Sequence, residues 1–291
     1  MKLADIHILH QSGFYRVVDY KCHCTICSVT DPEYNTSFCL SFIRKGFFEY
    51  RSFRRNDEVH TGRLLISKPG YEHTTRHIDN QPDIVTIFDF SRTFYEETIL
   101  EQYGNKLPWI LKNNDIHSIM VSAGPEMEYL HHCILERLRS RDHSSLEIDE
   151  LIMSLLEKTM LLLGSAKLPE VVTDRLKQQH LGTVEAAREF ILTRFQENIS
   201  LEQLARHCLV SPFHFSRIFR TLTGESPHQY LLWVRMAHAK VLLKATARPV
   251  AAIAYECGFS SPEHFVTSFK KHLKVNPSAF RNSLAQKQQD L

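Results

Sequence analysis

The C-terminal third of the chain contains an internal repeat, which constrains the fold more than any other feature of the sequence. Residues 211–219 recur as residues 261–269, and five of the nine positions are identical: one Ser, one Pro, one His and two Phe. Flanking positions also match, at offsets of 49 or 50: Leu204-Ala205 with Ile253-Ala254, Cys208 with Cys257, and Pro227 with Pro277. This agreement indicates two copies of one supersecondary unit.

Each copy has the pattern of two short capped helices. Ser200, with Gln203 three residues later, is a capping-box pattern that predicts the start of a first helix. The buried face of this helix is predicted to be Leu201, Leu204, Ala205 and Cys208. After a tight turn, Ser211 and Pro212 predict the cap and first residue of a second helix, and Phe215 and Phe219 are predicted to pack back on the first.

The second copy repeats this arrangement, with residues 249–257 as the first helix, Gly258-Phe259 as the turn and Ser261-Pro262 at the start of the second helix. Two short helices joined by a tight turn, with basic residues on the outer face, are typical of a helix-turn-helix unit. Residues 226–245 predict a connecting helix of about 27 Å, a length that could place the two second helices about one DNA turn apart. The alternative is a helical bundle in which the repeats serve packing alone.

Several residues of the repeat resemble the arabinose-regulator (AraC/XylS) family over about 183–284: Leu204-Ala205, Ser211-Pro212, Arg217, Phe219, Ile253-Ala254, Gly258-Phe259, Ser261, Phe265, Phe269-Lys270, Pro277 and Arg281. The resemblance implies that exposed positions of each second helix contact bases. These positions are Phe213, Ser216 and Arg217 in the first copy, and Glu263, Val266 and Thr267 in the second.

The chemistry of these side chains suggests different roles for them. The guanidinium of Arg217 can bind guanine O6 and N7 together, and Arg220, Lys270 and Lys271 are candidates for phosphate contacts. Leu209 stands at a turn position where the family often has Gly. Thr267 replaces a frequent Arg, and Glu263 adds a negative charge, so the second copy is expected to bind phosphate more than it reads bases. Phe213 could instead be partly buried in the core.

Charge is distributed unevenly along the chain. Residues 182–291 contain 14 Lys and Arg against 8 Asp and Glu, a net charge of +6, whereas the whole chain has 35 against 33. A basic segment of this kind fits a polyanion partner, although solvated surface charge gives the same sum. Seven cysteines, an odd number, and the lack of an apolar export signal at the start predict reduced thiols in the cytoplasm, and no apolar stretch is long enough to span a membrane.

The N-terminal half has the pattern of an α+β domain. Residues 14–90 contain alternating or β-branched runs separated by turns, which predict an antiparallel sandwich or barrel. Helical spacing follows in 94–103, 125–139 and 146–163. The apolar stripe of the last helix (Ile148, Leu151, Ile152, Leu155, Leu156 and Thr159) could pack on its own domain or form a dimer seam. We therefore predict a sensing and dimerisation domain at 1–163, a linker at 164–182, and a DNA-binding domain of two helix-turn-helix units joined by a long helix at 183–291.

A weaker resemblance links the N-terminal half to the cupin barrel, through Gly62, Pro69-Gly70 and His73. Many regulators of the AraC/XylS family carry such a barrel as an effector domain. The resemblance also leaves a second hypothesis, a cupin-type metal-dependent enzyme with an accessory DNA-binding tail. That hypothesis needs several His and carboxylate ligands, yet His77 stands where cupin enzymes often have Asn, and no His-x-His precedes it.

A cysteine cluster offers a possible metal site in the same half. Cys22, Cys24 and Cys27 have spacings that can chelate Zn²⁺ or Cu(I), with His73 and His77 as further ligands. The same thiols could form a redox pair, or could simply be small core residues. A separate set could meet a polar or anionic small-molecule effector: Arg44, Tyr50, Arg51, Arg54, Tyr71 and Arg76.

Together these patterns predict a sequence-specific transcription regulator rather than an enzyme. Its expected partners are double-stranded promoter DNA, a small-molecule or metal effector, RNA polymerase and a second copy of the chain, with no membrane partner.

Overall fold

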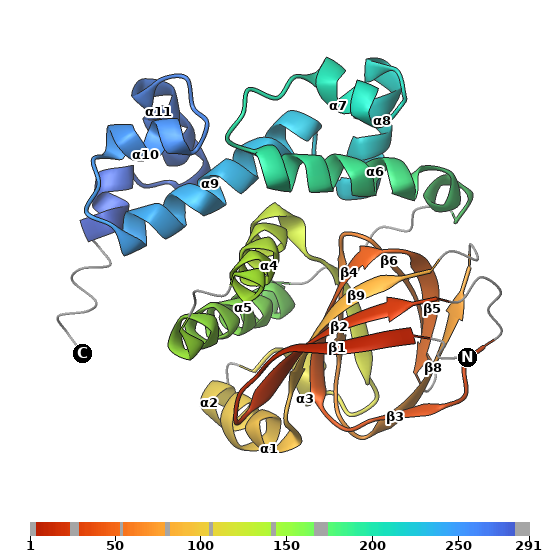
Figure 1. Ribbon diagram of the computed structural model, residues 1–291. Helices are drawn as coiled ribbons and strands as arrows, with labels where there is room; N and C mark the ends of the chain where they lie inside the picture. The colour runs from red at the N-terminus through yellow and green to blue at the C-terminus, as the bar shows by residue number, and fades with distance from the viewer. Residues whose placement is uncertain are drawn as a thin grey trace. The chain divides into compact units, whose positions relative to one another are not determined.

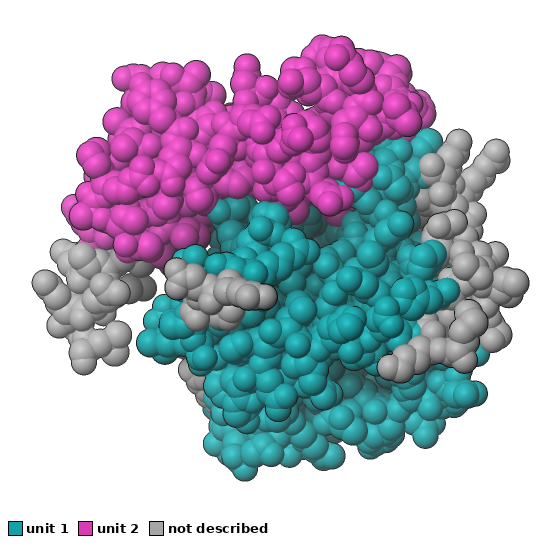
Figure 2. All heavy atoms as spheres, viewed as in Figure 1, with its two compact units in different colours: residues 1–185 teal, residues 186–291 magenta. Residues whose placement is uncertain are grey.

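The computed structural model of the protein describes residues 4–23, 29–52, 55–78, 82–104, 107–140, 144–165 and 174–282. The chain forms two compact units, residues 1–185 and residues 186–291 (Figure 2). Unit 1 contains the strands together with the first helices, and unit 2 is helical (Figure 1). The predicted α+β class, with a β-rich N-terminal region followed by a helical domain, is therefore confirmed.

The strands of unit 1 form two antiparallel sheets. Their bounds are β1 (Ala4–Gln11), β2 (Tyr15–Cys22), β3 (Glu33–Asn35), β4 (Phe38–Lys45), β5 (Phe47–Ser52), β6 (Arg55–His60), β7 (Arg63–Ser67), β8 (Tyr71–His77), β9 (Ile84–Phe90) and β10 (Ser118–Ser122). One sheet has the order β1-β2-β9-β4-β7-β10 and the other the order β3-β8-β5-β6. The sequence predicted a cupin-like β-barrel with trailing helices; the β-rich region is present, but its two sheets do not close into a single barrel.

The helices follow the strands in three groups. Unit 1 contains α1 (Arg92–Phe94), the π-helix η1 (Tyr95–Leu100), α2 (Glu101–Tyr103), α3 (Trp109–Lys112), α4 (Gly124–Arg139) and α5 (Ser145–Ser165). α6 (Asp174–Arg194) runs across the division between the units. Unit 2 continues with α7 (Leu201–His207), α8 (Pro212–Thr223), α9 (Pro227–Ala245), α10 (Val250–Glu256) and α11 (Pro262–Leu273). No helix in the described part of the chain is long and apolar enough to cross a bilayer.

The six-stranded sheet contributes apolar side chains to both of its faces, because residues alternate between faces along each strand. On one face, Phe42 and Phe88 are buried in the main core together with Ile134 of α4 and Ile152 of α5. On the other face, residues such as Ile43 and Val85 pack in a second cluster with Phe48, Tyr50 and Val59 of the smaller sheet. The six-stranded sheet is thus covered by helices on one side and by the smaller sheet on the other.

The apolar stripe of α5 belongs to the core of unit 1. Ile148, Ile152 and Leu155 are fully buried there, and Thr159 is buried as well. The Tyr15 hydroxyl on β2 also donates a hydrogen bond to Asp149 Oδ1 on α5, at 2.6 Å. Of the two interpretations of this stripe, packing on its own domain is the one observed, so a dimer would have to use another surface.

The predicted linker, residues 164–182, is helical at both of its described ends. α5 continues to Ser165 and α6 begins at Asp174, while residues 166–173 lie outside the described residues. The division between the two units falls at residues 185 and 186, within α6. The boundaries of the sensing domain, the linker and the DNA-binding domain stay a prediction.

A buried histidine lies where α4 packs on the six-stranded sheet. The ring of His131 stacks on Phe42 with centroids 4.4 Å apart, and its Nε2 has no hydrogen-bond partner among the described residues. Burial, together with the charges of Arg44, His132 and Arg139, lowers the pKa of His131 to about 3. The neutral ring is therefore the form that the core accepts.

This burial predicts a pH-dependent stability. Since the folded-state pKa of His131 lies below the unfolded value of about 6.5, its contribution is fully present above pH 6.5 and is lost as the pH falls from there toward 3. Urea unfolding between about pH 7.5 and 5 should show the wild type losing up to about 1.4 kcal/mol per pH unit relative to His131→Phe, which has no ionisable ring. Parallel pH profiles for the two proteins would contradict this account.

Candidate DNA-binding interface

The first helix-turn-helix unit consists of α7 and α8, and both caps were predicted correctly. The Ser200 hydroxyl accepts a hydrogen bond from Gln203 N, and the Gln203 side chain accepts one from Ser200 N, which completes the capping box. Ser211 caps α8 by accepting a hydrogen bond from His214 N, with Pro212 in the first turn. These bonds satisfy amides that a helix start leaves without intrahelical partners.

Burial fixes which face of α8 points outward. Phe215 and Phe219 are fully buried, and Ile218 is buried on the same side. On α7, Leu204 and Ala205 are buried, whereas Leu201 is 38% exposed and Cys208 is only half-buried. The predicted apolar face of α7 is therefore narrower than expected, because its first residue lies at the open end of the helix.

The second helix-turn-helix unit, formed by α10 and α11, repeats the first with one difference at its start. Ser261 caps α11 by accepting a hydrogen bond from His264 N, and Phe265 and Phe269 are fully buried. α10 begins after Pro249, which makes no side-chain cap. The two helix-turn-helix units lie at opposite ends of α9 (Figure 1). α9 has 19 residues, which corresponds to about 28 Å.

The turns of the two units share a left-handed backbone but differ in residue type. Leu209 adopts φ 57° and is 92% exposed, and Gly258, at the matching position, adopts φ 82°. A Cβ at Gly258 would lie 2.6 Å from the carbonyl oxygen of Gln196, so this turn also requires Gly for space. The expected departure at Leu209 therefore does not change the turn, and its cost is backbone strain of about 1–2 kcal/mol.

Arg235 on α9 connects the chain after α6 to the second turn. Its Nε donates a hydrogen bond to Phe195 O and its Nη2 donates one to Glu197 O, both at 2.7 Å. Its guanidinium also lies 5.7 Å from the centroid of the Phe259 ring, within cation–π range. Burial lowers the pKa of Arg235. Arg235 therefore links the segment that precedes the first helix-turn-helix unit to the turn of the second.

The residues predicted to read bases lie on the outward side of each second helix. Phe213 is 82% exposed, so the alternative that it is partly buried in the core is wrong. Arg217, Glu263 and Thr267 are also exposed, and Ser216 is half-buried. Val266 is partly buried and packs against the core of the second helix-turn-helix unit, so only part of its surface can face a partner.

The predicted phosphate-binding residues form an exposed basic set on the same two helices. Arg220 lies in the last turn of α8, and Lys270 and Lys271 lie in the last turn of α11. Neither these three cations nor Arg217 forms an ion pair with any described residue. The nearest polar contact of Arg217 is with His214 Nδ1, at 3.5 Å. Cations without a carboxylate partner among the described residues are suited to neutralise an external anion.

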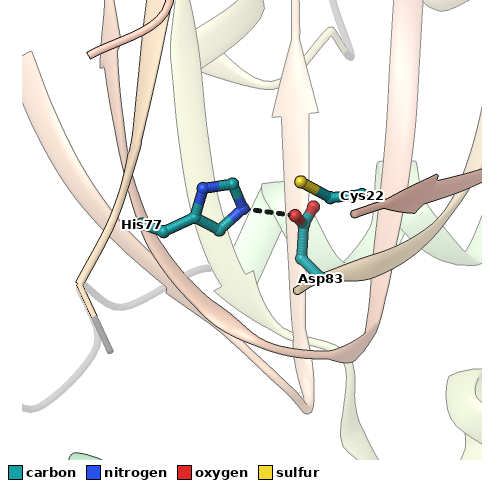
Figure 3. A group of neighbouring side chains, drawn as sticks. All are labelled: Cys22, His77 and Asp83. Carbon is teal, nitrogen blue, oxygen red and sulfur yellow. Dashed lines mark hydrogen bonds and ion pairs between the residues drawn. The ribbon is translucent and has the colours of Figure 1, made fainter. Parts of the chain in front are cut away.

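The structure brings together two of the predicted metal ligands and adds a third residue. Cys22 at the end of β2, His77 at the end of β8 and Asp83 before β9 place a thiol, an imidazole nitrogen and a carboxylate oxygen within 4.8 Å of one another (Figure 3). Cys24 and Cys27 lie outside the described residues. The sequence analysis did not identify Asp83 as a ligand. In the structure, the antiparallel pairing of Lys21 with Ile84 brings the end of β2 beside Asp83.

His73 does not join this group, contrary to the prediction. It lies on the same strand as His77 but four residues away, which separates the two by about 13 Å along the strand. Its ring stacks on Tyr50 with centroids 4.7 Å apart, and its Nε2 lies 3.8 Å from Glu33 Oε2. Burial lowers the pKa of His73. It is part of the packing of the smaller sheet.

The residues proposed to meet a small effector also do not converge. Arg44 pairs with Asp19, Arg76 pairs with Glu49, and Tyr71 stacks on His117. Tyr50 is buried against His73, Arg51 is exposed, and Arg54 lies outside the described residues. The interpretation of these six residues as one ligand site is therefore not supported.

Comparison with known proteins finds matches that include the two helix-turn-helix units. A helix-turn-helix domain family model matches residues 204–283. The chain is 31% identical over 99 residues to the lactose operon transcription activator of Staphylococcus xylosus, an alignment that covers 34% of this chain and 36% of the relative. It is 26% identical over 236 residues to the MmsAB operon regulatory protein of Pseudomonas aeruginosa, covering 80% of this chain and 69% of the relative.

One solved structure aligns with most of the chain at low similarity. The structure of ToxT from Vibrio cholerae with an unsaturated fatty acid bound matches 94% of this chain and 96% of its own chain, with 13% identity and a TM-score of 0.38. The chain spans only about a third of the length of the lactose operon activator. The matched helix-turn-helix domain lies within unit 2, and both relatives are named as regulators of operons.

The two turns predict opposite responses to substitution. Leu209→Gly removes a strained, exposed side chain and should raise the free energy of unfolding by about 0.5–1 kcal/mol, because part of the strain relief is offset by the entropy of Gly. Gly258→Ala should lower it by about 2–4 kcal/mol, because its Cβ meets the Gln196 backbone. Urea titration of the full chain measures both effects, and equal destabilisation by the two variants would contradict this difference.

Proposed function

We propose that the protein is a sequence-specific DNA-binding transcription regulator whose promoter binding responds to a signal sensed in its N-terminal unit. Arg217 reads guanine, and Phe213, Ser216, Glu263, Val266 and Thr267 face the base edges. Arg220, Lys270 and Lys271 bind phosphates. The observation that carries this proposal is the duplicated helix pair, in which buried Phe residues turn an exposed face outward from both α8 and α11.

The second helices of the two copies make different kinds of contact with DNA. On α8, Arg217 and Arg220 supply positive charge near the exposed Phe213. On α11, Glu263 lies in the first turn, whereas Lys270 and Lys271 lie in the last turn. Because a carboxylate repels phosphate, α8 carries most of the base recognition and α11 mainly anchors the DNA backbone.

Sensing is assigned to unit 1. An open hollow of about 300 Å³ lies at the turn between β1 and β2 and is lined by polar and aromatic residues, among them Arg16, Asp89, Phe14 and Tyr15. Its size falls at the lower end of the range for small-molecule sites. We propose this hollow as the place where a small effector binds, against the Arg16–Asp89 ion pair and the aromatic rings in its wall.

The remaining partners follow from a regulator of this class. We propose that the protein acts in the cytoplasm as a homodimer and contacts RNA polymerase at the promoter. Since the α5 stripe is buried within its own unit, the dimer contact uses other residues of unit 1. The cupin-type enzyme hypothesis is not favoured, because His73 and His77 do not share one site and the relatives described above are named as regulators.

The first test maps the genomic sites that the full chain binds and measures the affinity for one recovered fragment. Arg217→Ala should weaken this affinity by about 1–3 kcal/mol, about 5- to 150-fold in Kd, and should relax the preference at one base pair. Arg51→Ala removes the same charge from an exposed position in unit 1 and serves as the matched control. Unchanged affinity and selectivity in the Arg217 variant would refute its assigned role.

The second test separates anchoring from base recognition. The double variant Lys270→Ala, Lys271→Ala should weaken binding to specific and unrelated DNA alike. It should also reduce the slope of log K against log salt by about 1.8, because each lost phosphate contact contributes about 0.9. Lys45→Ala, at an exposed position in unit 1, should leave the slope unchanged. A slope equal to that of the wild type would show that these lysines do not contact phosphate.

A further inference from the structure

The ends of three strands in unit 1 meet at a buried group with the composition of a metal site. Cys22 ends β2, His77 ends β8, and Asp83 immediately precedes β9 (Figure 3). β2 and β9 belong to the six-stranded sheet, whereas β8 belongs to the smaller sheet. Cys22 and Asp83 are 4% and 5% exposed, and the side chain of His77 is 8% exposed. The group therefore lies where the two sheets come together, away from solvent.

The chemistry of the group fits one kind of ion. A thiolate, an imidazole and a carboxylate are all ligands of Zn²⁺, a borderline cation. Cu(I) prefers sulfur ligands alone, and Mg²⁺ and Ca²⁺ prefer oxygen ligands. We propose that Cys22 Sγ, His77 Nε2 and an Asp83 carboxylate oxygen bind one Zn²⁺ ion that fastens the two sheets together, leaving a fourth coordination position for a water molecule or other small ligand.

The geometry needs only a small adjustment to accept the ion. Tetrahedral zinc with bonds of about 2.0–2.3 Å requires ligand atoms about 3.3–3.8 Å apart. The three ligand atoms already lie within 4.8 Å of one another, and His77 Nε2 lies 2.5 Å from Asp83 Oδ1. The histidine and the carboxylate must therefore separate by about 1 Å, a change that side-chain rotation can supply.

The charges of the group match those of a divalent cation. The buried Asp83 carboxylate has His77 Nε2 as a hydrogen-bond partner, and a bound cation would compensate its charge more fully. With Zn²⁺ bound, one thiolate and one carboxylate balance the two positive charges, and the histidine coordinates in its neutral form. The metal therefore neutralises the group without a buried proton, and its binding releases the proton of the Cys22 thiol.

The backbone around the group holds Asp83 in place. Cys22 N donates a hydrogen bond to Asp83 O at 2.9 Å, which ties two of the three ligand-bearing segments together. Gly46, in the turn between β4 and β5, has φ 107°, and a Cβ there would lie only 2.7 Å from Asp83 Cβ. The chain thus passes so close to Asp83 that only Gly fits, which restricts the freedom of this carboxylate.

The test uses the full chain, first stripped with a chelator and then titrated with Zn²⁺ or Co²⁺. The wild type should bind one ion per chain, unfold at a higher temperature with Zn²⁺, and show sulfur-to-cobalt charge-transfer absorption with Co²⁺. Cys22→Ser should lose that absorption, and both Cys22→Ser and Asp83→Asn should weaken binding at least about 100-fold, more than loss of an outer hydrogen bond usually costs. Cys39→Ser, which changes another buried cysteine of the same unit, should bind as the wild type does.

Two results would overturn the proposal. One is a wild-type protein that takes up no stoichiometric Zn²⁺ or Co²⁺. The other is retention of wild-type affinity by the Cys22 and Asp83 variants together with loss of binding in Cys24→Ser, Cys27→Ser. Asp83→Asn keeps the shape of the side chain and its ability to hydrogen-bond His77, so it provides a folded test protein if Cys22→Ser is unstable. DNA affinity is measured on the same preparations, and failure of metal binding leaves the proposed function standing.

Discussion

The burial of two phenylalanines in each second helix is the interaction on which unit 2 depends. Phe215 and Phe219 in α8, and Phe265 and Phe269 in α11, are each fully buried. Each such side chain contributes about 1.5–3 kcal/mol, so rotating either helix about its axis would cost several kcal/mol. Since a helix has only one orientation that buries both rings, the same interaction decides which residues face outward. The exposed surface that we propose binds DNA is thus a consequence of core packing.

The sequence predicted unit 2 well because its signals are local. Ser200 with Gln203, and Ser211 with Pro212, act within one turn of helix, and the repeat supplied a second, independent observation of the same pattern. Leu209 shows the limit of this reasoning. Its residue type left the geometry of the first turn open, and the helices on either side hold the backbone there in the left-handed conformation. Arg235 could not be predicted either, because its partners lie nearly 40 residues away in the sequence.

Unit 1 was predicted less completely because its contacts join distant segments. The strands and the long helices were found from periodicity, but which sheet each strand joins is not encoded in any single segment. The prediction of a metal site in this unit stays untested, and its residues illustrate the difficulty. Cys24 and Cys27 were chosen because they neighbour Cys22 in sequence, whereas the structure places Asp83, 61 residues further along, beside it. His131 shows the same limit, since nothing in the sequence of α4 marks it as buried against Phe42.

The two helix-turn-helix units pack in the same way but carry different charges. This difference in charge affects how one chain selects a DNA site. Both second helices have a Ser cap, a first-turn Pro and a buried Phe pair, so their backbones are presented in the same way. Glu263, in the first turn of α11, is stabilised by the helix N-terminus but opposes close approach to phosphate there, whereas Lys270 and Lys271 favour it at the other end. The first turn of α8 carries no acid. An anchoring unit joined through α9 to a reading unit would allow the chain to hold DNA electrostatically while Arg217 samples bases, so that affinity and selectivity depend on different helices.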